Sequence, residues 1–312
     1  MSEPSINSPH PLIYTYQQAA FDRMCAIARA FIYTNFERLP IKPRGNLFLV
    51  APSGSGKTHL AHAVARSMNL EFMAVPVSEW IVMSASQRSA PSTWPTIWQF
   101  LIHSANKEGC LIFLDELDKV GRHNQGDWIR FQTTEVFSLL DRRIPKNLND
   151  LEGDKISDSR ISDAEAVLNT KTLIVAGGAF QEIWDTPPAI GFSSMPDTPV
   201  QVPDLKRLSQ YIPPELSRRF GSQLVLLPQL QEADYHDMLY RILPALPTQW
   251  RLLFEKLACA GIPEAIRLAQ GPRFFEEILL EVAVQERLAL TGPLPPEKVI
   301  PYKEGIEREL VR

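Results

Sequence analysis

A short glycine-rich segment, APSGSGKT at residues 51 to 58, has the residue types that bind a phosphate chain, and we call it the phosphate loop. Gly54 and Gly56 let the backbone curl so that consecutive N–H groups point at an anion, and a helix beginning there adds its positive dipole end. Lys57 would reach the β- and γ-phosphates, and the Thr58 hydroxyl would bind Mg²⁺. Ala51 replaces the first glycine of the strict pattern. The predicted nucleotide-binding residues are Pro52, Ser53, Gly54, Ser55, Gly56, Lys57, Thr58 and His59.

Two adjacent acids supply the second half of such a site. Asp115 ends the apolar run CLIFLD, 58 positions after Lys57, and Glu116 follows it. At a strand end the Asp115 carboxylate can hold Mg²⁺ through water, and Glu116 can polarise an attacking water. Surface acids often end strands, so this pair alone is a weak motif. It indicates a nucleotide site because the phosphate loop precedes it. Together the two motifs predict nucleotide hydrolysis as well as binding.

Three apolar runs must position these groups, and each has the unbroken pattern of a strand covered on both faces. They are NLFLVA at 46 to 51, CLIFLD at 110 to 115 and TLIVAGG at 172 to 178. Helical or polar segments separate the runs, and a helical pattern at 15 to 39 precedes the first. The sequence therefore predicts an α/β fold with a parallel, buried sheet.

Beyond Pro228 the strand pattern stops, and apolar residues recur at helical spacing from 232 to 290. We expect a flexible tail at 1–12, an α/β nucleotide-binding domain at 13–228 and a small α-helical domain at 229–312.

The composition is that of a globular protein, with 312 residues, 45% hydrophobic and 22% charged. The apolar runs are too short to span a membrane, and the first residues lack a signal-peptide pattern, so we expect a cytoplasmic protein. A net charge of -4 gives no electrostatic reason for tight nucleic-acid binding. Three scattered cysteines fit reduced thiols better than a disulfide framework or a zinc site.

Several motifs in order resemble AAA+ ATPases, and more narrowly the ClpX-type protein unfoldases. They are APSGSGKT, DELDKV, GGAF and the late GPR, and YTNFERL at 33 to 39 and IPPELSRRF at 212 to 220 extend the resemblance. It covers nearly the whole chain from about residue 13. The resemblance implies a P-loop AAA+ module with a parallel-sheet large domain and a small α-helical lid domain, using ATP and Mg²⁺.

In addition to Glu116, the expected catalytic acid, the same resemblance assigns catalytic roles to two arginines. Arg219 matches the arginine finger that reaches the ATP of a neighbouring subunit, with Arg218 as the close competitor. Arg273 matches a second sensor arginine that contacts the nucleotide of its own subunit. A finger acting in trans implies a homo-hexameric ring or an open spiral. Gly177 and Gly178 stand where many AAA+ ATPases have a polar sensor, so we assign no catalytic side chain there.

The sequence departs from the ClpX-type pattern where substrate is gripped. No aromatic flanked by glycines lies near Ala85, and we expect Trp80 and Trp94 to pack in the core. The segment from 145 to 170 has six acids against three bases and reads as a solvated loop. The zinc-binding domain that precedes the motor in typical ClpX is missing, so we expect clients to be chosen by the motor surface or an adaptor.

Two functions remain open. One is ATP-driven remodelling of proteins, in which Ile190, Gly191 and Phe192 would dock a ClpP-like peptidase. The other is an ATP-controlled switch that assembles on a partner or nucleoprotein complex without threading a polypeptide. Whether Gln17 and Gln18 contact the base or are helix-surface amides is also open, and we favour the latter.

Overall fold

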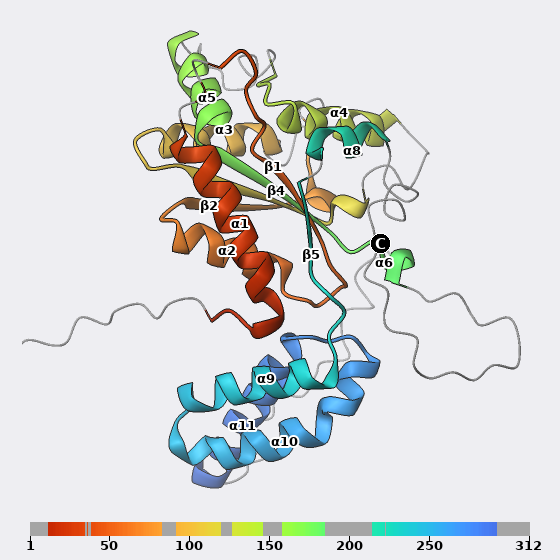
Figure 1. Cartoon of the computed structure of the whole chain (residues 1–312). Coiled ribbons are helices and arrows are strands. Elements are labelled where there is room, and N and C mark those ends of the chain that lie inside the picture. The colour runs from red at the N-terminus through yellow and green to blue at the C-terminus, as the bar shows by residue number, and fades with distance from the viewer. Residues whose placement is uncertain are drawn as a thin grey trace, which may run out of the picture.

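The computed structural model describes residues 12–34, 36, 39–82, 92–119, 127–145, 158–184, 214–221 and 223–291. Within them a five-stranded parallel sheet has the order β2-β3-β4-β1-β5 (Figure 1). Its strands are β1 Asn46–Val50, β2 Glu71–Pro76, β3 Cys110–Asp115, β4 Thr172–Gly178 and β5 Leu224–Leu226. The three predicted strands are thus present, and the fold is the expected α/β class. Sequence reasoning missed β5, which is only three residues long and lies at the sheet edge.

Helices cover both faces of this sheet, which explains why its central strands are apolar apart from the end residues Asn46, Asp115 and Thr172. The helices of one face are α1 Thr15–Tyr33 and α2 Lys57–Ser67, which share a buried cluster with Leu47, Leu49 and Phe113. On the other face lie α3 Thr93–Ser104, α4 Asp127–Leu140, α5 Asp158–Thr170, α6 Gln181–Trp184 and α8 Pro214–Phe220. Residues of β1 alternate between the two clusters, as the period of two of a strand requires.

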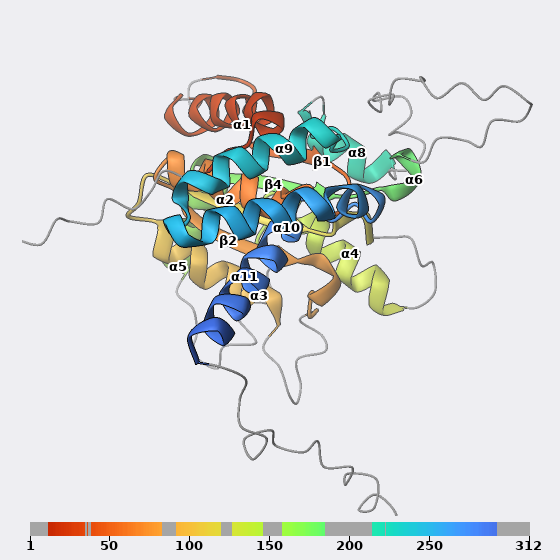
Figure 2. The ribbon, with the colours of Figure 1, turned by 90° about the horizontal axis from the view of Figure 1, so that it is seen from below.

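A third cluster belongs to the last helices, α9 Glu232–Ile242, α10 Thr248–Arg267 and α11 Arg273–Thr291, which we call the lid. Tyr235, Phe254 and Phe275 are almost fully buried within it. Figure 1 shows the lid as a separate group of helices below the sheet, and in Figure 2, which is seen from below, these helices lie in front of it. The short helices η1 Val77–Glu79, η3 Leu117–Lys119 and η5 Leu243–Ala245 complete the described elements.

The segment from 145 to 170 is not wholly a solvated loop, because its second half forms α5. Ala164, Val167 and Leu168 recur at helical spacing and are buried against α3 and β4, and Ile161 packs beside them. The six acids made this segment look like a loop. Burial of the helix depends on its apolar face, which net charge does not describe.

Two further features of the structure concern the cysteines and the length of the apolar helices. Cys25, Cys110 and Cys259 are free thiols. No helix in the described part of the chain is long and apolar enough to cross a membrane.

Candidate nucleotide site

A cavity of about 600 Å³ lies at the carboxyl ends of the strands, between the sheet and the lid. This is where open parallel sheets bind ligands, because loops and helix N-termini converge there. Nine of the predicted site residues line it, namely Ser53, Gly54, Gly56, Lys57, Thr58, His59, Asp115, Glu116 and Arg273. Pro52 and Ser55 are buried within the phosphate loop. The rest of the wall combines apolar lid residues, including Phe254, Phe275 and Leu279, with other residues that include Tyr14, Asp118, Lys119, Ala179 and Glu276.

The phosphate loop has the backbone that its glycines predict. Gly54 and Gly56 have φ angles of 75° and 77°, in the left-handed region that glycine enters without a steric penalty. The Ser55 hydroxyl donates to the Pro52 carbonyl at 2.7 Å and closes the turn. Because α2 begins at Lys57, its first free N–H groups stand at the cavity, which favours an anion there.

Lys57 is oriented by the loop itself. Its Nζ donates to the carbonyl oxygens of Ala51 at 3.1 Å and Pro52 at 3.0 Å. An ammonium has three N–H donors, so one remains for a ligand. Burial lowers the pKa of Lys57, while the carboxylates of Asp115 and Asp118 act in the opposite direction.

The two predicted magnesium ligands meet. Thr58 Oγ1 donates to Asp115 Oδ2 at 2.7 Å, and the Glu116 N–H donates to Asp115 Oδ1 at 2.9 Å. No group of three or more His, Cys, Asp or Glu side chains in the described residues could hold a metal alone. One hydroxyl and one carboxylate nevertheless suit Mg²⁺, which is usually held by one or two protein oxygens together with phosphates and water.

Glu116 adopts an unusual backbone conformation beside this pair. Its φ is 57°, which costs energy for a residue with a Cβ and is most often found at functional sites. Ser78 Oγ donates to Glu116 Oε2 at 2.5 Å. Sequence reasoning missed Ser78, although it lies just past β2 as Glu116 lies just past β3, and Pro76 pairs with Asp115. A polar residue after the neighbouring strand was the available signal.

The glycines that end β4 have a packing reason. A Cβ on Gly177 would lie 2.6 Å from the Phe113 ring and 3.6 Å from Asp115 Oδ1, and a Cβ on Gly178 would lie 2.3 Å from Phe180. Since β4 lies between β1 and β3, a side chain here would press on the strand that carries Asp115.

Two further predicted residues complete the wall. Arg273 begins α11, is exposed, and is close enough to Lys57 that its charge opposes protonation of the lysine. Burial, with help from the neighbouring His62, lowers the pKa of His59. Because an ordinary histidine pKa is about 6.5, the His59 imidazole is neutral at pH 7.

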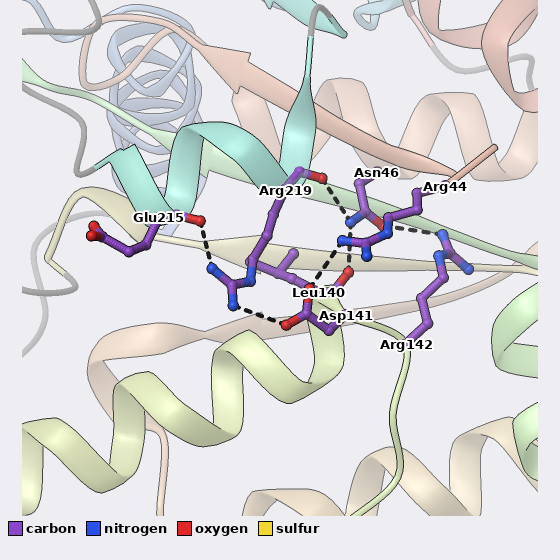
Figure 3. Close-up of polar contacts among 7 residues, drawn as sticks. All are labelled: Arg44, Asn46, Leu140, Asp141, Arg142, Glu215 and Arg219. Carbon is purple, nitrogen blue, oxygen red and sulfur yellow. Dashed lines mark hydrogen bonds and ion pairs between the residues drawn. The ribbon is translucent and has the colours of Figure 1, made fainter.

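Arg219 lies near the amino ends of β1 and β5, whereas the cavity lies at the carboxyl ends of the strands. It precedes β5, and its carbonyl oxygen accepts a hydrogen bond from Asn46, the first residue of β1. Figure 3 shows its side chain pointing to Asp141, where Nη2 donates to Oδ2 at 2.9 Å. Asp141 also pairs with Arg44 at 3.0 Å. Arg218, by contrast, is exposed and has no hydrogen bond or ion pair within the described part of the chain.

One residue was wrongly interpreted from the sequence. Gln17 is not a surface amide, because it is fully buried and its Nε2 donates to the Ser55 carbonyl at 3.3 Å. Its partner is 38 positions away, so no local pattern marks it. Gln18 is an exposed amide that donates to Asp22, as expected.

The expected core tryptophans are buried. Trp80 is 2% exposed and Trp94 is fully buried, and Trp80 Nε1 donates to Glu135 Oε2 at 2.9 Å. The residues expected to dock a peptidase, Ile190, Gly191 and Phe192, and the pore position near Ala85 lie outside the described residues.

Comparisons with known proteins agree with this geometry. Residues 47–177 match the family model described as "ATPase family associated with various cellular activities (AAA)". The chain is 30% identical over 112 residues to peroxisomal ATPase pex6 of Schizosaccharomyces pombe, which is 36% of this chain and 11% of that relative. It is 32% identical over 120 residues, 38% of this chain and 27% of the relative, to the 26S proteasome regulatory subunit S10B homolog B of Arabidopsis thaliana.

A bacterial relative gives the same result. The ATP-dependent zinc metalloprotease FtsH of Magnetococcus marinus is 34% identical over 88 residues, 28% of this chain and 12% of the relative. The chain thus spans between about a tenth and about a quarter of the length of these relatives. The matched region contains the phosphate loop, Asp115 and Glu116, and so the chain carries an AAA ATPase domain homologous to those of AAA+ proteins.

Proposed function

We propose that this protein hydrolyses ATP with Mg²⁺ and uses the energy, in a ring or spiral of identical subunits, to remodel protein clients. The observation that carries the proposal is the joining of Thr58 and Asp115 within 2.7 Å, beside Glu116, in one cavity with Lys57. Mg²⁺ bound there would neutralise charge on the phosphates. Two relatives are named as a proteasome regulatory subunit and an ATP-dependent protease, which supports protein as the client class.

Each side chain then has a distinct task. The phosphate-loop N–H groups and the free N–H of Lys57 bind phosphate oxygens, and Thr58 and Asp115 hold the ion. Glu116 orients and polarises the attacking water, and its Ser78 bond keeps the carboxylate in place. Arg273 contacts the phosphates from the lid, and the apolar lid wall covers the rest of the nucleotide. We divide the chain at 228/229 into a nucleotide-binding domain and the lid.

An arginine of α8 acts in trans in this proposal. Because β1 and β5 are parallel, α8 lies at their amino ends, whereas the phosphate loop follows the carboxyl end of β1. Neither Arg218 nor Arg219 belongs to the wall of its own cavity. The resemblance favours Arg219, and its bond to Asp141 would have to yield to the neighbour's phosphate. Arg218 is the alternative, favoured by its exposure and its lack of a partner in the described part of the chain.

The ClpX-type resemblance rests on sequence motifs, of which DELDKV and GGAF are the most specific, since the relatives named above are other AAA proteins. Docking of a ClpP-like peptidase through Ile190 to Phe192 also rests on the sequence. Deleting these three residues should abolish capture of such a peptidase while ATP hydrolysis continues. An unchanged capture would remove docking from the proposal.

A second function, an ATP-controlled assembly switch, is favoured by one observation. Trp80, the aromatic nearest the expected pore position, is buried and bonded to Glu135, so it cannot grip a polypeptide. The deciding experiment is capture with Glu116→Gln in the presence of ATP, followed by identification of the retained molecules. Unfolded proteins or a peptidase would support remodelling, whereas a nucleoprotein complex would support the switch.

A further inference from the structure

Two side chains at the beginning of α1 donate hydrogen bonds to the same atom of the phosphate loop, the main-chain carbonyl oxygen of Ser55. Tyr16 Oη donates to this oxygen at 3.0 Å, and Gln17 Nε2 donates at 3.3 Å. Ser55 is 1% exposed and Gln17 is fully buried. Water therefore cannot take the place of either donor without rearrangement, and loss of both would leave a buried acceptor unsatisfied.

The Gln17 amide is fixed on both sides. The Tyr14 N–H donates to Gln17 Oε1 at 3.5 Å, which directs the amide nitrogen at the phosphate loop. Gly56 leaves the room that this amide needs, because a Cβ at that position would lie 2.9 Å from Gln17 Nε2. The side chain of Gln17 and the backbone of the loop thus fit each other closely.

The same segment is attached to the lid. The Thr15 N–H donates to Asp237 Oδ2 at 3.2 Å, and Arg241 of α9 donates to Thr15 Oγ1 at 2.6 Å. Tyr14 is buried in the lid cluster. From the other side the turn between α10 and α11 packs on the loop so tightly that a Cβ on Gly271 would lie 2.0 Å from the Gly54 carbonyl oxygen. The phosphate loop is therefore held between α1 and this turn.

Peptide geometry links the Ser55 carbonyl to nucleotide binding. In a planar trans peptide the carbonyl of Ser55 and the N–H of Gly56 point in opposite directions. Two donors that hold the carbonyl toward α1 therefore turn the Gly56 N–H away from α1, and Gly56 lines the cavity. If the peptide flipped, a carbonyl dipole would replace an N–H dipole beside the phosphates and repel them.

We infer that Tyr16 and Gln17 are positioning residues for the nucleotide, acting through the Ser55 peptide. The inference rests on the proposed ATPase function, and it adds α1 to the parts that set nucleotide affinity. Neither side chain needs to touch the reacting atoms. Their removal should weaken nucleotide binding and leave the hydrolytic step of the saturated protein nearly unchanged.

The test is the double variant Tyr16→Phe with Gln17→Met, which deletes both donors and nearly conserves volume. Its affinity for a fluorescent ATP analogue should fall roughly 10- to 30-fold, as expected for two lost hydrogen bonds to a buried oxygen. The KM for ATP should rise in parallel while kcat at saturation changes by less than about twofold. If the double variant does not fold, Tyr16→Phe alone removes one oxygen atom and should give a roughly threefold to fivefold loss.

Two matched controls lie on the same helix. Gln18→Met removes an exposed amide, and Tyr33→Phe removes the hydroxyl of a tyrosine that is 56% exposed at the far end of α1. Both should bind the analogue like the wild type. Wild-type affinity in the double variant, or a fall in kcat without a change in affinity, would overturn the inference. If the wild type binds the analogue but does not hydrolyse ATP, the proposed ATPase function fails and the binding test still decides the role of Tyr16 and Gln17. No binding by the wild type would overturn both.

Discussion

The two ends of the parallel strands, which we call the carboxyl edge and the amino edge of the sheet, carry similar charged residues in opposite arrangements. At the carboxyl edge, Lys57 and Arg273 face the cavity, and neither forms an ion pair in the described residues. At the amino edge, Asp141 pairs with both Arg44 and Arg219. The first set is available to a ligand, whereas the second is held in ion pairs within the chain.

Further polar contacts extend inward from the amino edge. Asn46 donates to the Leu140 carbonyl at 2.8 Å and accepts from Arg142 at 3.1 Å, and Arg142 also donates to the Thr172 carbonyl at 2.9 Å. Burial lowers the pKa of Arg142 to about 9. Residue type alone therefore does not identify a site, since a buried charge that meets its partners within the chain is structural. Arg219 is the residue whose assignment depends most on this distinction.

The largest expected effect comes from removing the arginine that acts in trans. Arg219→Ala should reduce ATP turnover of the assembled protein by roughly 10³-fold, the scale of an arginine finger, and leave nucleotide affinity nearly intact. Arg218→Ala is the matched variant one residue away and should retain most of the turnover. The reverse result would assign the role to the exposed arginine. Turnover measured against protein concentration completes the test, because equal losses in dilute and assembled protein would exclude action in trans.

Glu116→Gln should reduce kcat by roughly 10²- to 10³-fold, because an amide cannot accept the proton of the attacking water. ATP affinity should persist, since the phosphate loop, Thr58 and Asp115 are unchanged. Glu79→Gln is the control, as Glu79 is an exposed acid next to Ser78 and is not part of the cavity wall. Normal hydrolysis by Glu116→Gln would contradict the mechanism.

The carboxyl edge was largely predictable from the sequence, and the reason is chemical. A phosphate loop needs glycines, a lysine and a hydroxyl at fixed spacing, and a strand that carries Asp115 between two others must be apolar. Even there, sequence reasoning missed Ser78, Tyr16 and the role of Gln17. These residues act through tertiary contacts with partners 38 or 39 positions away.

The amino edge was not predictable. Asp141 and Arg219 are 78 positions apart, and the residues near each of them in the sequence do not predict this contact. The α5 helix was hidden for a related reason, because six acids dominate the composition from 145 to 170 while the few apolar residues decide the burial. The family resemblance named Arg219 from its place in a motif, and a motif does not report which partners a side chain has within its own subunit.

Asp141→Asn measures how much the two ion pairs at the amino edge contribute to stability. The side chain of Asp141 is 24% exposed and serves two arginines, so its loss should lower the free energy of unfolding by about 1–2 kcal/mol in urea denaturation. ATP affinity should not change, because β1 separates Asp141 from the cavity. Asp163→Asn, at an exposed position of α5, should stay within about 0.5 kcal/mol of the wild type. A loss of ATP affinity in Asp141→Asn would show that the two edges are coupled.

The smallest effect concerns the ring beneath Arg219. The guanidinium carbon lies 4.0 Å from the centroid of the Phe137 ring, a distance at which a cation is attracted to the π face. Phe137→Leu keeps apolar cover and removes that face, so beyond any packing loss it should cost about 0.5–1 kcal/mol of unfolding free energy. Repeating Phe137→Leu in an Arg219→Ala background isolates the contact, because only packing remains to be lost there. A coupling energy near zero would mean that Asp141 alone holds Arg219, and exchange of this one ion pair for a neighbour's phosphate would then suffice to release the side chain.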